Sequence, residues 1–166
     1  MAIGGYDPGG VKNSTELWNG TNWTEVNNLN QAKAYPGATG ITTAALAFSG
    51  WLDATPENSD KTESWNGTNW TEVSALNTAK RSVKGLGIQT ASLAVGGYST
   101  TLVTSTELWT GSSWSEQNDI NTATSNGGTS GSTSAGLYFG GATPSKTAAT
   151  EEWNSPSNTV KTISTD

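Results

Sequence analysis

A tandem repeat constrains the fold of this chain more than any other feature. The tetrad Thr-Glu-x-Trp occurs four times in 166 residues, and its tryptophans are 47, 44 and 44 residues apart. An apolar, glycine-containing element recurs in the same order at residues 2–6, 47–51, 94–98 and 138–142. A period of about 20–50 residues indicates like units that stack on one another to build a common core. The chain is therefore predicted to form one domain of four units, approximately residues 1–30, 31–77, 78–121 and 122–166.

Each unit has the composition of four short β-strands. In the third unit we expect them near residues 82–90, 92–98, 105–110 and 113–118, which are runs rich in Val, Ile, Leu, Thr and Trp. Asn-Gly pairs at residues 19–20 and 66–67 lie between the two Trp-bearing strands, where a tight hairpin requires residues that tolerate positive φ. No stretch shows a 3.6-residue apolar period, so essentially no helix is expected.

A single sheet of this size cannot bury both of its faces. Radial stacking of such sheets solves the problem, and it predicts an all-β fold, a β-propeller of four-stranded antiparallel blades. Paired glycines at the end of the second strand of a unit fit the close approach of backbones expected there. Seven of the eight tryptophans occupy repeated strand positions and are expected to fill the space between neighbouring blades: Trp18, Trp23, Trp65, Trp70, Trp109, Trp114 and Trp153.

The order of these elements resembles the kelch repeat. In the third unit a strand with Gly85 and Gly87 is followed by a strand that ends in Gly96-Gly97, and then by the two strands that carry Trp109 and Trp114. The chain departs from the kelch pattern by having Trp where kelch repeats have Tyr, and by having Ser49 in place of a glycine. The resemblance implies a propeller of the galactose-oxidase and kelch type. Such Trp- and Thr-rich repeats also resemble those of phage and environmental-microbe proteins, which implies a virion or surface component.

The predicted strands do not fill four complete blades. The chain opens in a second strand, so the first unit has three strands and the total is fifteen. This count leaves open a four-bladed monomer, a homodimer or other closed ring in which two copies give eight blades, and a piece of a longer ring. Exposed faces and strand edges favour association of copies. The near identity of residues 18–26 and 65–73 also leaves open a recent duplication or a designed or reconstructed chain.

The residue types present exclude several kinds of chemistry. The chain has no histidine and no cysteine, so Ser–His and Cys–His nucleophiles and imidazole–zinc sites cannot form, and the galactose-oxidase activity does not carry over. We expect no enzymatic activity, no cofactor and no metal. A net charge of −6 without a basic stripe argues against nucleic acid and anionic membranes as partners. The sequence contains no recognisable signal peptide or transmembrane segment, so we expect a soluble chain.

One glutamate recurs at the same strand position in every unit: Glu16, Glu63, Glu107 and Glu151. A residue present in every copy is first explained by something that every blade needs, such as a hydrogen bond that closes a turn. We therefore interpret these four carboxylates as structural rather than as the paired acids of a glycosidase.

Candidate binding residues lie where the units differ. The loop between the second and third strands is longest in the second unit, at residues 52–60, and Trp51 at its base is the one tryptophan outside the repeated positions. Tyr6 and Tyr98 occupy the equivalent positions of other units. Aromatic rings beside Asp53 and Glu57 suit stacking on a sugar or contact with a protein, whereas the structural alternative is that Trp51 caps its blade. Calcium binding by the acidic residues of this loop would lack the spacing of an EF-hand.

The sequence therefore predicts a non-enzymatic interaction or structural module. The alternative is a carbohydrate-binding lectin with one shallow site on each blade.

Overall fold

The computed structural model describes residues 1–53, 57–143, 145–155 and, for the backbone alone, 159–163. These residues form β-strands joined by turns, and the predicted all-β fold is confirmed. None of the described residues belongs to a helix that could cross a membrane. The predicted long loop of the second unit includes residues 54–56, which lie outside the described residues.

Four antiparallel sheets follow one another along the chain. The first sheet contains β1 (Ala2–Asp7), β2 (Gly10–Trp18) and β3 (Trp23–Val26). The second contains β4 (Gly37–Ile41), β5 (Ala44–Phe48), β8 (Thr62–Trp65) and β9 (Trp70–Val73), with the short pair β6 (Trp51–Leu52) and β7 (Glu57–Asn58) between β5 and β8. The third contains β10 (Lys84–Ile88), β11 (Ala91–Val95), β12 (Thr106–Trp109) and β13 (Trp114–Glu116). The fourth contains β14 (Gly128–Gly131), β15 (Ala135–Phe139), β16 (Thr150–Asn154) and β17 (Thr159–Ile163).

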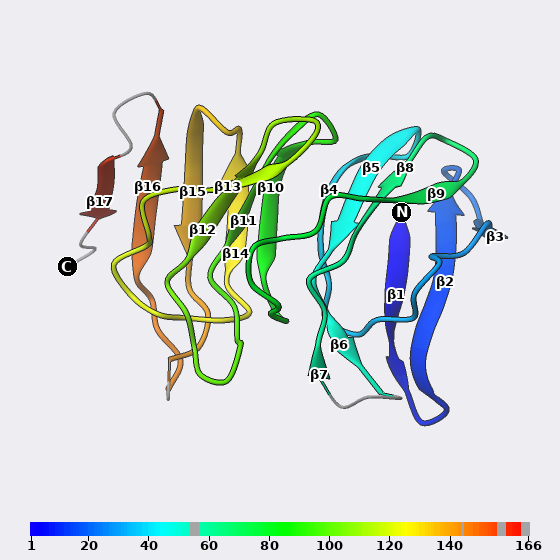
Figure 1. The fold of residues 1–166 in the computed structure, drawn as a ribbon, viewed down its shortest axis with the longest axis horizontal. Coiled ribbons are helices and arrows are strands. Elements are labelled where there is room, and N and C mark those ends of the chain that lie inside the picture. The colour runs from blue at the N-terminus through cyan, green and yellow to red at the C-terminus, as the bar shows by residue number, and fades with distance from the viewer. Residues whose placement is uncertain (54–56, 144, 156–158, 164–166) are drawn as a thin grey trace.

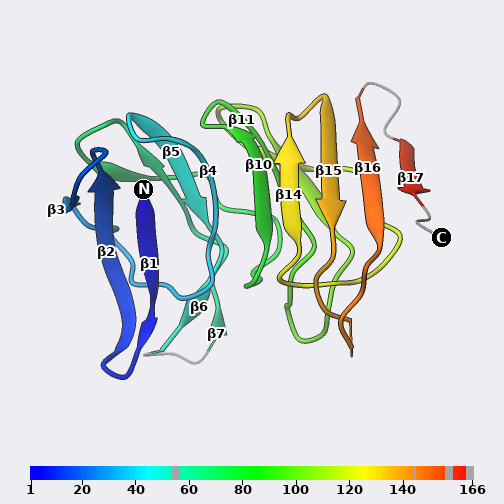
Figure 2. The same ribbon diagram turned by 180° about the vertical axis from the view of Figure 1, so that it is seen from behind.

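The sheets lie in a row, and the first and fourth sheets are at its opposite ends (Figures 1 and 2). Within each sheet the strands pair in sequence order, as expected for the predicted unit. The three-stranded first sheet confirms that the first unit lacks, among the described residues, the strand equivalent to β4. The described residues form an open row rather than a closed ring, so the propeller remains a prediction.

The tryptophan pairs sit on the two strands that each Asn-Gly or equivalent turn connects. Trp65 lies directly opposite Trp70 in the register of β8 and β9, and their ring centroids are 5.3 Å apart. Gly67 in the intervening turn has a φ of 94°, and Asn66 Oδ1 accepts hydrogen bonds from the N–H groups of Thr68 and Asn69. The turn chemistry predicted from Asn-Gly is confirmed, because positive φ is taken by a glycine and an Asn side chain closes the loop.

The paired glycines end the second strand of a unit where the backbone of the next connection comes close. Gly96 follows β11 with a φ of 59°, and a Cβ at this position would lie 2.7 Å from the carbonyl oxygen of Thr124. Ser49 takes the same left-handed conformation in the second unit, with a φ of 67°. Its hydroxyl donates to the carbonyl of Lys80, so the serine accommodates the close approach by bonding to the neighbouring backbone.

Three apolar clusters fill the spaces between consecutive sheets. Trp65 and Trp70 pack with residues of the first sheet, including Ile3. Trp109 and Trp114 pack against the second sheet, where the ring of Phe48 lies 4.9 Å from that of Trp114. Trp153 packs against the third sheet. In the second, third and fourth sheets the tryptophan-bearing face therefore covers the sheet that precedes it in the chain.

The opposite face of each sheet covers the sheet that follows. In β11, Leu93 and Val95 join the cluster with the fourth sheet, whereas Ala94 joins the cluster with the second. This alternation follows from the two-residue period of a strand. The first sheet has no preceding sheet among the described residues to cover its tryptophan face, and Trp18 and Trp23 are accordingly 46% and 52% exposed.

The first indole of each pair is held within its own sheet. Its N–H donates to a carbonyl in the turn between the first and second strands, over distances of 3.0, 3.0 and 2.9 Å: Trp65 to Thr42, Trp109 to Gln89 and Trp153 to Thr133. Trp18 occupies the same position in the first sheet, which lacks that turn among the described residues. The described part of the first sheet thus lacks the turn that supplies this acceptor to the other three indoles.

The second indole of each pair binds the preceding sheet. Trp70 Nε1 donates to Thr15 Oγ1 and Trp114 Nε1 donates to Thr62 Oγ1, both over 3.0 Å. Thr106 is the equivalent threonine of the third sheet, and its buried hydroxyl has no hydrogen-bond partner among the described residues. The register of the fourth sheet places Val160 opposite Trp153, where the second tryptophan of the other units stands. The fourth unit therefore has no tryptophan at the register position from which the second and third units donate to the preceding sheet.

We predict different costs for the same substitution at two buried threonines. Thr62→Val leaves the Trp114 N–H without an acceptor and should lower the free energy of unfolding by about 1–3 kcal/mol. Thr106→Val removes a hydroxyl that has no hydrogen-bond partner in the described part of the chain, so it should be neutral or stabilising. Urea unfolding followed by tryptophan fluorescence measures both. Equal destabilisation by the two variants would contradict this assignment of the indole hydrogen bonds.

Candidate functional site

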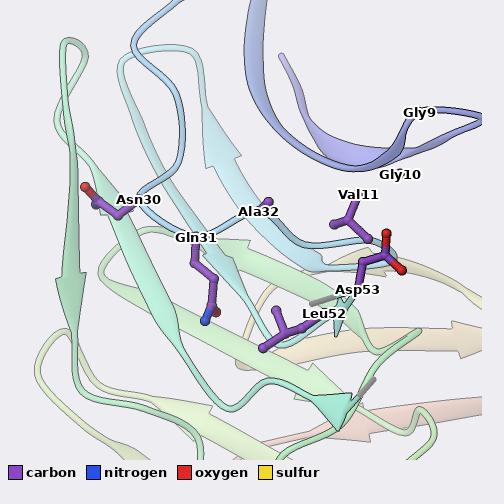
Figure 3. A pocket seen from close by; sticks show the side chains of 8 residues that line it. All are labelled: Gly9, Gly10, Val11, Asn30, Gln31, Ala32, Leu52 and Asp53. Atoms are coloured by element: carbon purple, nitrogen blue, oxygen red, sulfur yellow. The ribbon is translucent and has the colours of Figure 1, made fainter. Parts of the chain in front are cut away.

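A groove of 660 Å³ opens at one end of the first two sheets. The β1–β2 turn forms one side and the β6–β7 pair forms the other, and the two hairpins project from the same edge of the first two sheets, at the bottom of Figure 1. The described residues that line the groove are Gly9, Gly10, Val11, Asn30, Gln31, Ala32, Leu52 and Asp53 (Figure 3). In Figure 3 the side chains of Val11, Leu52 and Asp53 lie close together, whereas that of Asn30 points away from them.

An aromatic pair of one exposed ring, Tyr6, and one half-buried ring, Trp51, adjoins this groove. The rings of Tyr6 and Trp51 meet edge to face, with centroids 6.2 Å apart and an interplanar angle of 60°. The backbone of Trp51 is fixed by reciprocal hydrogen bonds with Ala34, of 2.9 and 2.7 Å. Trp51 directly precedes Leu52 and Asp53, so the segment that anchors the indole continues directly into two residues of the groove wall. The arrangement gives a rigid apolar surface next to polar groups, which is a common design of ligand sites.

The carboxylate of Asp53 lies against the backbone of the opposite hairpin. A Cβ built on Gly10 would be 3.0 Å from Asp53 Oδ2, and Gly10 has a φ of 98°, which favours glycine. On the same hairpin Lys12 Nζ is 3.0 Å from Asp7 Oδ1, and the N–H of Gly9 donates to that oxygen over 2.7 Å. These hydrogen bonds, that of Lys12 first, lower the pKa of Asp7. The ion pair of Asp7 with Lys12 and its hydrogen bond from Gly9 thus hold the β1–β2 turn.

The amide side chains of the groove are already engaged. Asn30 Nδ2 donates to Glu63 and to the carbonyl of Trp70, and Gln31 Oε1 accepts from the hydroxyl of Ser59. Asp53 is therefore the groove residue whose charge is best placed to meet a ligand. Sequence inspection missed the contribution of Gly9, Gly10 and residues 30–32, and the only available signal was the turn chemistry of Pro-Gly-Gly at residues 8–10.

The structure places four of the five predicted binding residues on the two hairpins beside the groove: Tyr6, Trp51, Asp53 and Glu57. Tyr98 lies instead beneath Arg81, whose guanidinium carbon is 4.4 Å from the ring centroid. Arg81 also donates to Asn58 Oδ1 over 2.9 Å, and Asn58 Nδ2 donates to the carbonyl of Ser99 over 2.7 Å. Tyr98 is therefore part of a contact between the second and third units.

Glu57 lies opposite Leu52 in the β6–β7 register, so it belongs to the same short strand pair as Trp51. Among the described residues no three acidic side chains come close enough together to hold a metal ion.

Buried glutamates tie the second, third and fourth sheets to the connections that lead into them. Glu63 accepts hydrogen bonds from the N–H and side-chain amide of Asn30, over 2.7 and 2.9 Å. Glu107 accepts the same two bonds from Asn77 over 2.7 and 2.9 Å, and Glu151 accepts them from Asn121 over 2.6 and 3.1 Å. We call this arrangement the glutamate clamp. Each clamp engages one carboxylate in hydrogen bonds to the chain. Three of the four repeated glutamates therefore have a structural role.

Two of the clamps also bury a lysine. Lys33 Nζ lies 3.3 Å from Glu63 Oε1, and Lys80 Nζ lies 3.2 Å from Glu107 Oε1, with all four side chains 0–1% exposed. Lys80 donates in addition to the hydroxyl of Ser105. Burial lowers the pKa of Lys33, and the neighbouring charge of Glu63 opposes this effect. A buried pair of this kind is costly to break, because either charge alone would be left without compensation.

In the fourth unit a tyrosine of β15 takes the place of the lysine, which in the other clamps comes from the connection between sheets. Thr124 stands where Lys33 and Lys80 stand in the earlier clamps, and Tyr138 stands where Ala94 stands in β11. The Tyr138 ring fills the space beside Gly127, whose N–H donates to the phenol oxygen over 3.3 Å. Burial raises the pKa of Tyr138. The short threonine and the glycine together make room for the larger ring.

Glu16 is the repeated glutamate without a clamp. It is exposed in the first sheet, where no preceding connection of the described chain reaches it. Its exposure matches that of Trp18 and Trp23, because all three belong to the face that would contact a preceding sheet.

No known protein-family model matches the chain, and no curated protein matches it in sequence. Any functional assignment therefore depends on the geometry described above.

We predict that neutralising the repeated glutamate lowers the free energy of unfolding only in the units where the glutamate forms a clamp. Glu107→Gln leaves Lys80 buried without its counter-charge and should cost about 3–5 kcal/mol of folding free energy. Glu16→Gln, the matched control at an exposed repeat position, should change it by less than about 0.5 kcal/mol. The pair Glu107→Gln and Lys80→Met together should recover part of the loss. Similar urea midpoints for the two single variants would refute the structural role of the clamp.

Proposed function

We propose that this chain is a non-enzymatic interaction module of the kelch-like propeller kind. We further propose that it binds its partner at the edge of the first two sheets from which the β1–β2 and β6–β7 hairpins project. The observation that carries the proposal is the edge-to-face pair of Tyr6 and Trp51 beside an open groove. Tyr6 is 57% exposed, and a large aromatic side chain held in place at the surface offers contact area at little cost in conformational entropy. Binding surfaces are enriched in such residues.

A non-catalytic role is supported by the disposition of the acidic residues. The buried carboxylates Glu63, Glu107 and Glu151 accept backbone hydrogen bonds in the clamps, so they are not available to transfer protons to a substrate. Asp53 is the one acidic residue among the described lining of the groove. A single carboxylate without histidine or cysteine suits recognition by hydrogen bonding better than acid–base chemistry, which needs a second titratable group.

The groove favours a neutral, hydrogen-bonding ligand with an apolar face. Its wall combines the aliphatic side chains of Val11 and Leu52 with glycine backbone and the Asp53 carboxylate, and its described lining contains no cationic side chain. An extended peptide segment or a neutral sugar has this chemistry. The resemblance of the repeats to phage proteins adds the proposal of a place on a virion or cell surface.

A lectin with one site on each blade is the second candidate. Tyr6, Trp51 and Tyr98 occupy equivalent positions, and aromatic rings stack well on sugar faces. Their surroundings differ, however, because Tyr98 is covered by Arg81 and the fourth unit has Ala142 at this position. A single site in the groove between the first two units is therefore favoured over four equivalent ones.

Binding at the groove can be tested with a glycan array and a displayed peptide library. We expect hits whose affinity, measured by titration calorimetry, falls at least about thirtyfold on Trp51→Ala, since a buried aromatic anchor is worth about 2 kcal/mol or more. Asp53→Asn should weaken binding less. Ile88→Ala is the matched control, because Ile88 is exposed in the β10–β11 hairpin, away from the groove. Hits that are unaffected by both groove variants would contradict the assignment, and an absence of sugar binding at millimolar concentration would eliminate the lectin.

A further inference from the structure

The row of sheets ends in two different exposed faces. The first sheet presents Trp18 and Trp23, which are 46% and 52% exposed. The fourth sheet presents Leu137 and Phe139 of β15, which are 37% and 42% exposed, on the face directed away from the third sheet. Large apolar side chains that are exposed together mark surfaces for association.

The chain itself shows how these two kinds of face fit together. Between the second and third sheets, the Phe48 ring meets the Trp114 ring at 4.9 Å and 66°, and Trp114 Nε1 donates to Thr62 Oγ1. Phe48 and Thr62 face each other in the β5–β8 register. The same combination of residues thus provides both the apolar contact and the hydrogen bond across the interface.

Both halves of this interface are present again at the two ends of the row. Phe139 and Thr150 face each other in the β15–β16 register, as Phe48 and Thr62 do in the second sheet. Trp23 lies opposite Trp18 in the first sheet, as Trp114 lies opposite Trp109 in the third. The fourth sheet therefore carries the phenylalanine and threonine half, and the first sheet carries the tryptophan half.

We propose that a second copy of this chain docks head to tail on the first, with the fourth sheet of one copy covering the first sheet of the other. Phe139 then packs on Trp23 of the second copy, and the Trp23 N–H donates to the Thr150 hydroxyl. The proposal goes beyond ligand binding at the groove and does not depend on it. The occupant is a second copy because the exposed faces are the two halves of an interface that this sequence already forms between its own consecutive sheets.

The association is heterologous, since each copy contributes a different face. Such contacts close into a ring when the rotation between subunits permits it, and otherwise continue as an open chain. Two copies would supply eight sheets, which is at the upper end of the usual range of about four to eight propeller blades. Glu152 stands opposite Leu137 at the position of Leu108 in the third sheet, so this interface is less apolar than the internal ones. We accordingly expect a concentration-dependent equilibrium.

Sedimentation velocity over a wide range of concentration tests the proposal. The wild-type chain should pass from the monomer to a species of at least twice its mass, and its tryptophan emission should shift to shorter wavelength as Trp18 and Trp23 become buried. Trp23→Glu and Phe139→Glu should each remain monomeric. Leu137→Glu is a second variant of the same face as Phe139, and Ile88→Glu is the control at an exposed apolar residue of the third sheet, away from both end faces. Circular dichroism checks that every variant is folded.

Mixing the variants distinguishes a head-to-tail contact from a symmetric one. Trp23→Glu retains an intact fourth sheet and Phe139→Glu retains an intact first sheet, so an equimolar mixture should recover a dimer that neither variant forms alone. A wild-type chain that stays monomeric at all concentrations would overturn the proposal. So would dimerisation of Phe139→Glu by itself, because the first sheets would then be pairing with each other.

Discussion

The structure depends on the contact between the tryptophan face of one sheet and the opposite face of the sheet before it. A sheet with four short strands exposes two broad faces to water, and neither can be buried within the sheet. The contact combines ring packing, such as that of Phe48 with Trp114, with an indole hydrogen bond to a threonine of the preceding sheet. Where the contact is present the tryptophans are buried, and in the first sheet, where it is absent, they are exposed.

The glutamate clamps complement this packing by fixing the connections between sheets. In each clamp a buried glutamate carboxylate accepts hydrogen bonds from the backbone N–H and the side-chain amide of an asparagine, and a buried carboxylate would be costly to leave unpaired. The fourth unit keeps the clamp while exchanging a lysine for Thr124 and an alanine for Tyr138. The carboxylate is thus the fixed element of the repeat, whereas the group that fills the space beside it varies.

Features suited to binding arise where the repeat is broken. The groove forms between the β1–β2 turn and the β6–β7 extension, which have no counterparts of the same length in the later units. The end faces arise in the same way, because among the described residues the first and fourth sheets each contact a neighbouring sheet on one side only. The repeated residues form the contacts between sheets, and the exposed surfaces lie where the repeat is interrupted.

The sequence by itself determined the all-β class, the four units, their strand order and the three-stranded first sheet, because strand alternation and turn chemistry are local properties that a repeat makes visible. Only the tertiary structure decided which face each tryptophan occupies, which connection each glutamate holds and where the groove lies. Tyr98 illustrates the reason: its repeat position is that of Trp51, yet it pairs with Arg81, whereas Trp51 faces Ala34 in the equivalent bridge. Equivalent positions share a backbone, but their chemistry depends on side chains that are distant in sequence and that stacking brings together.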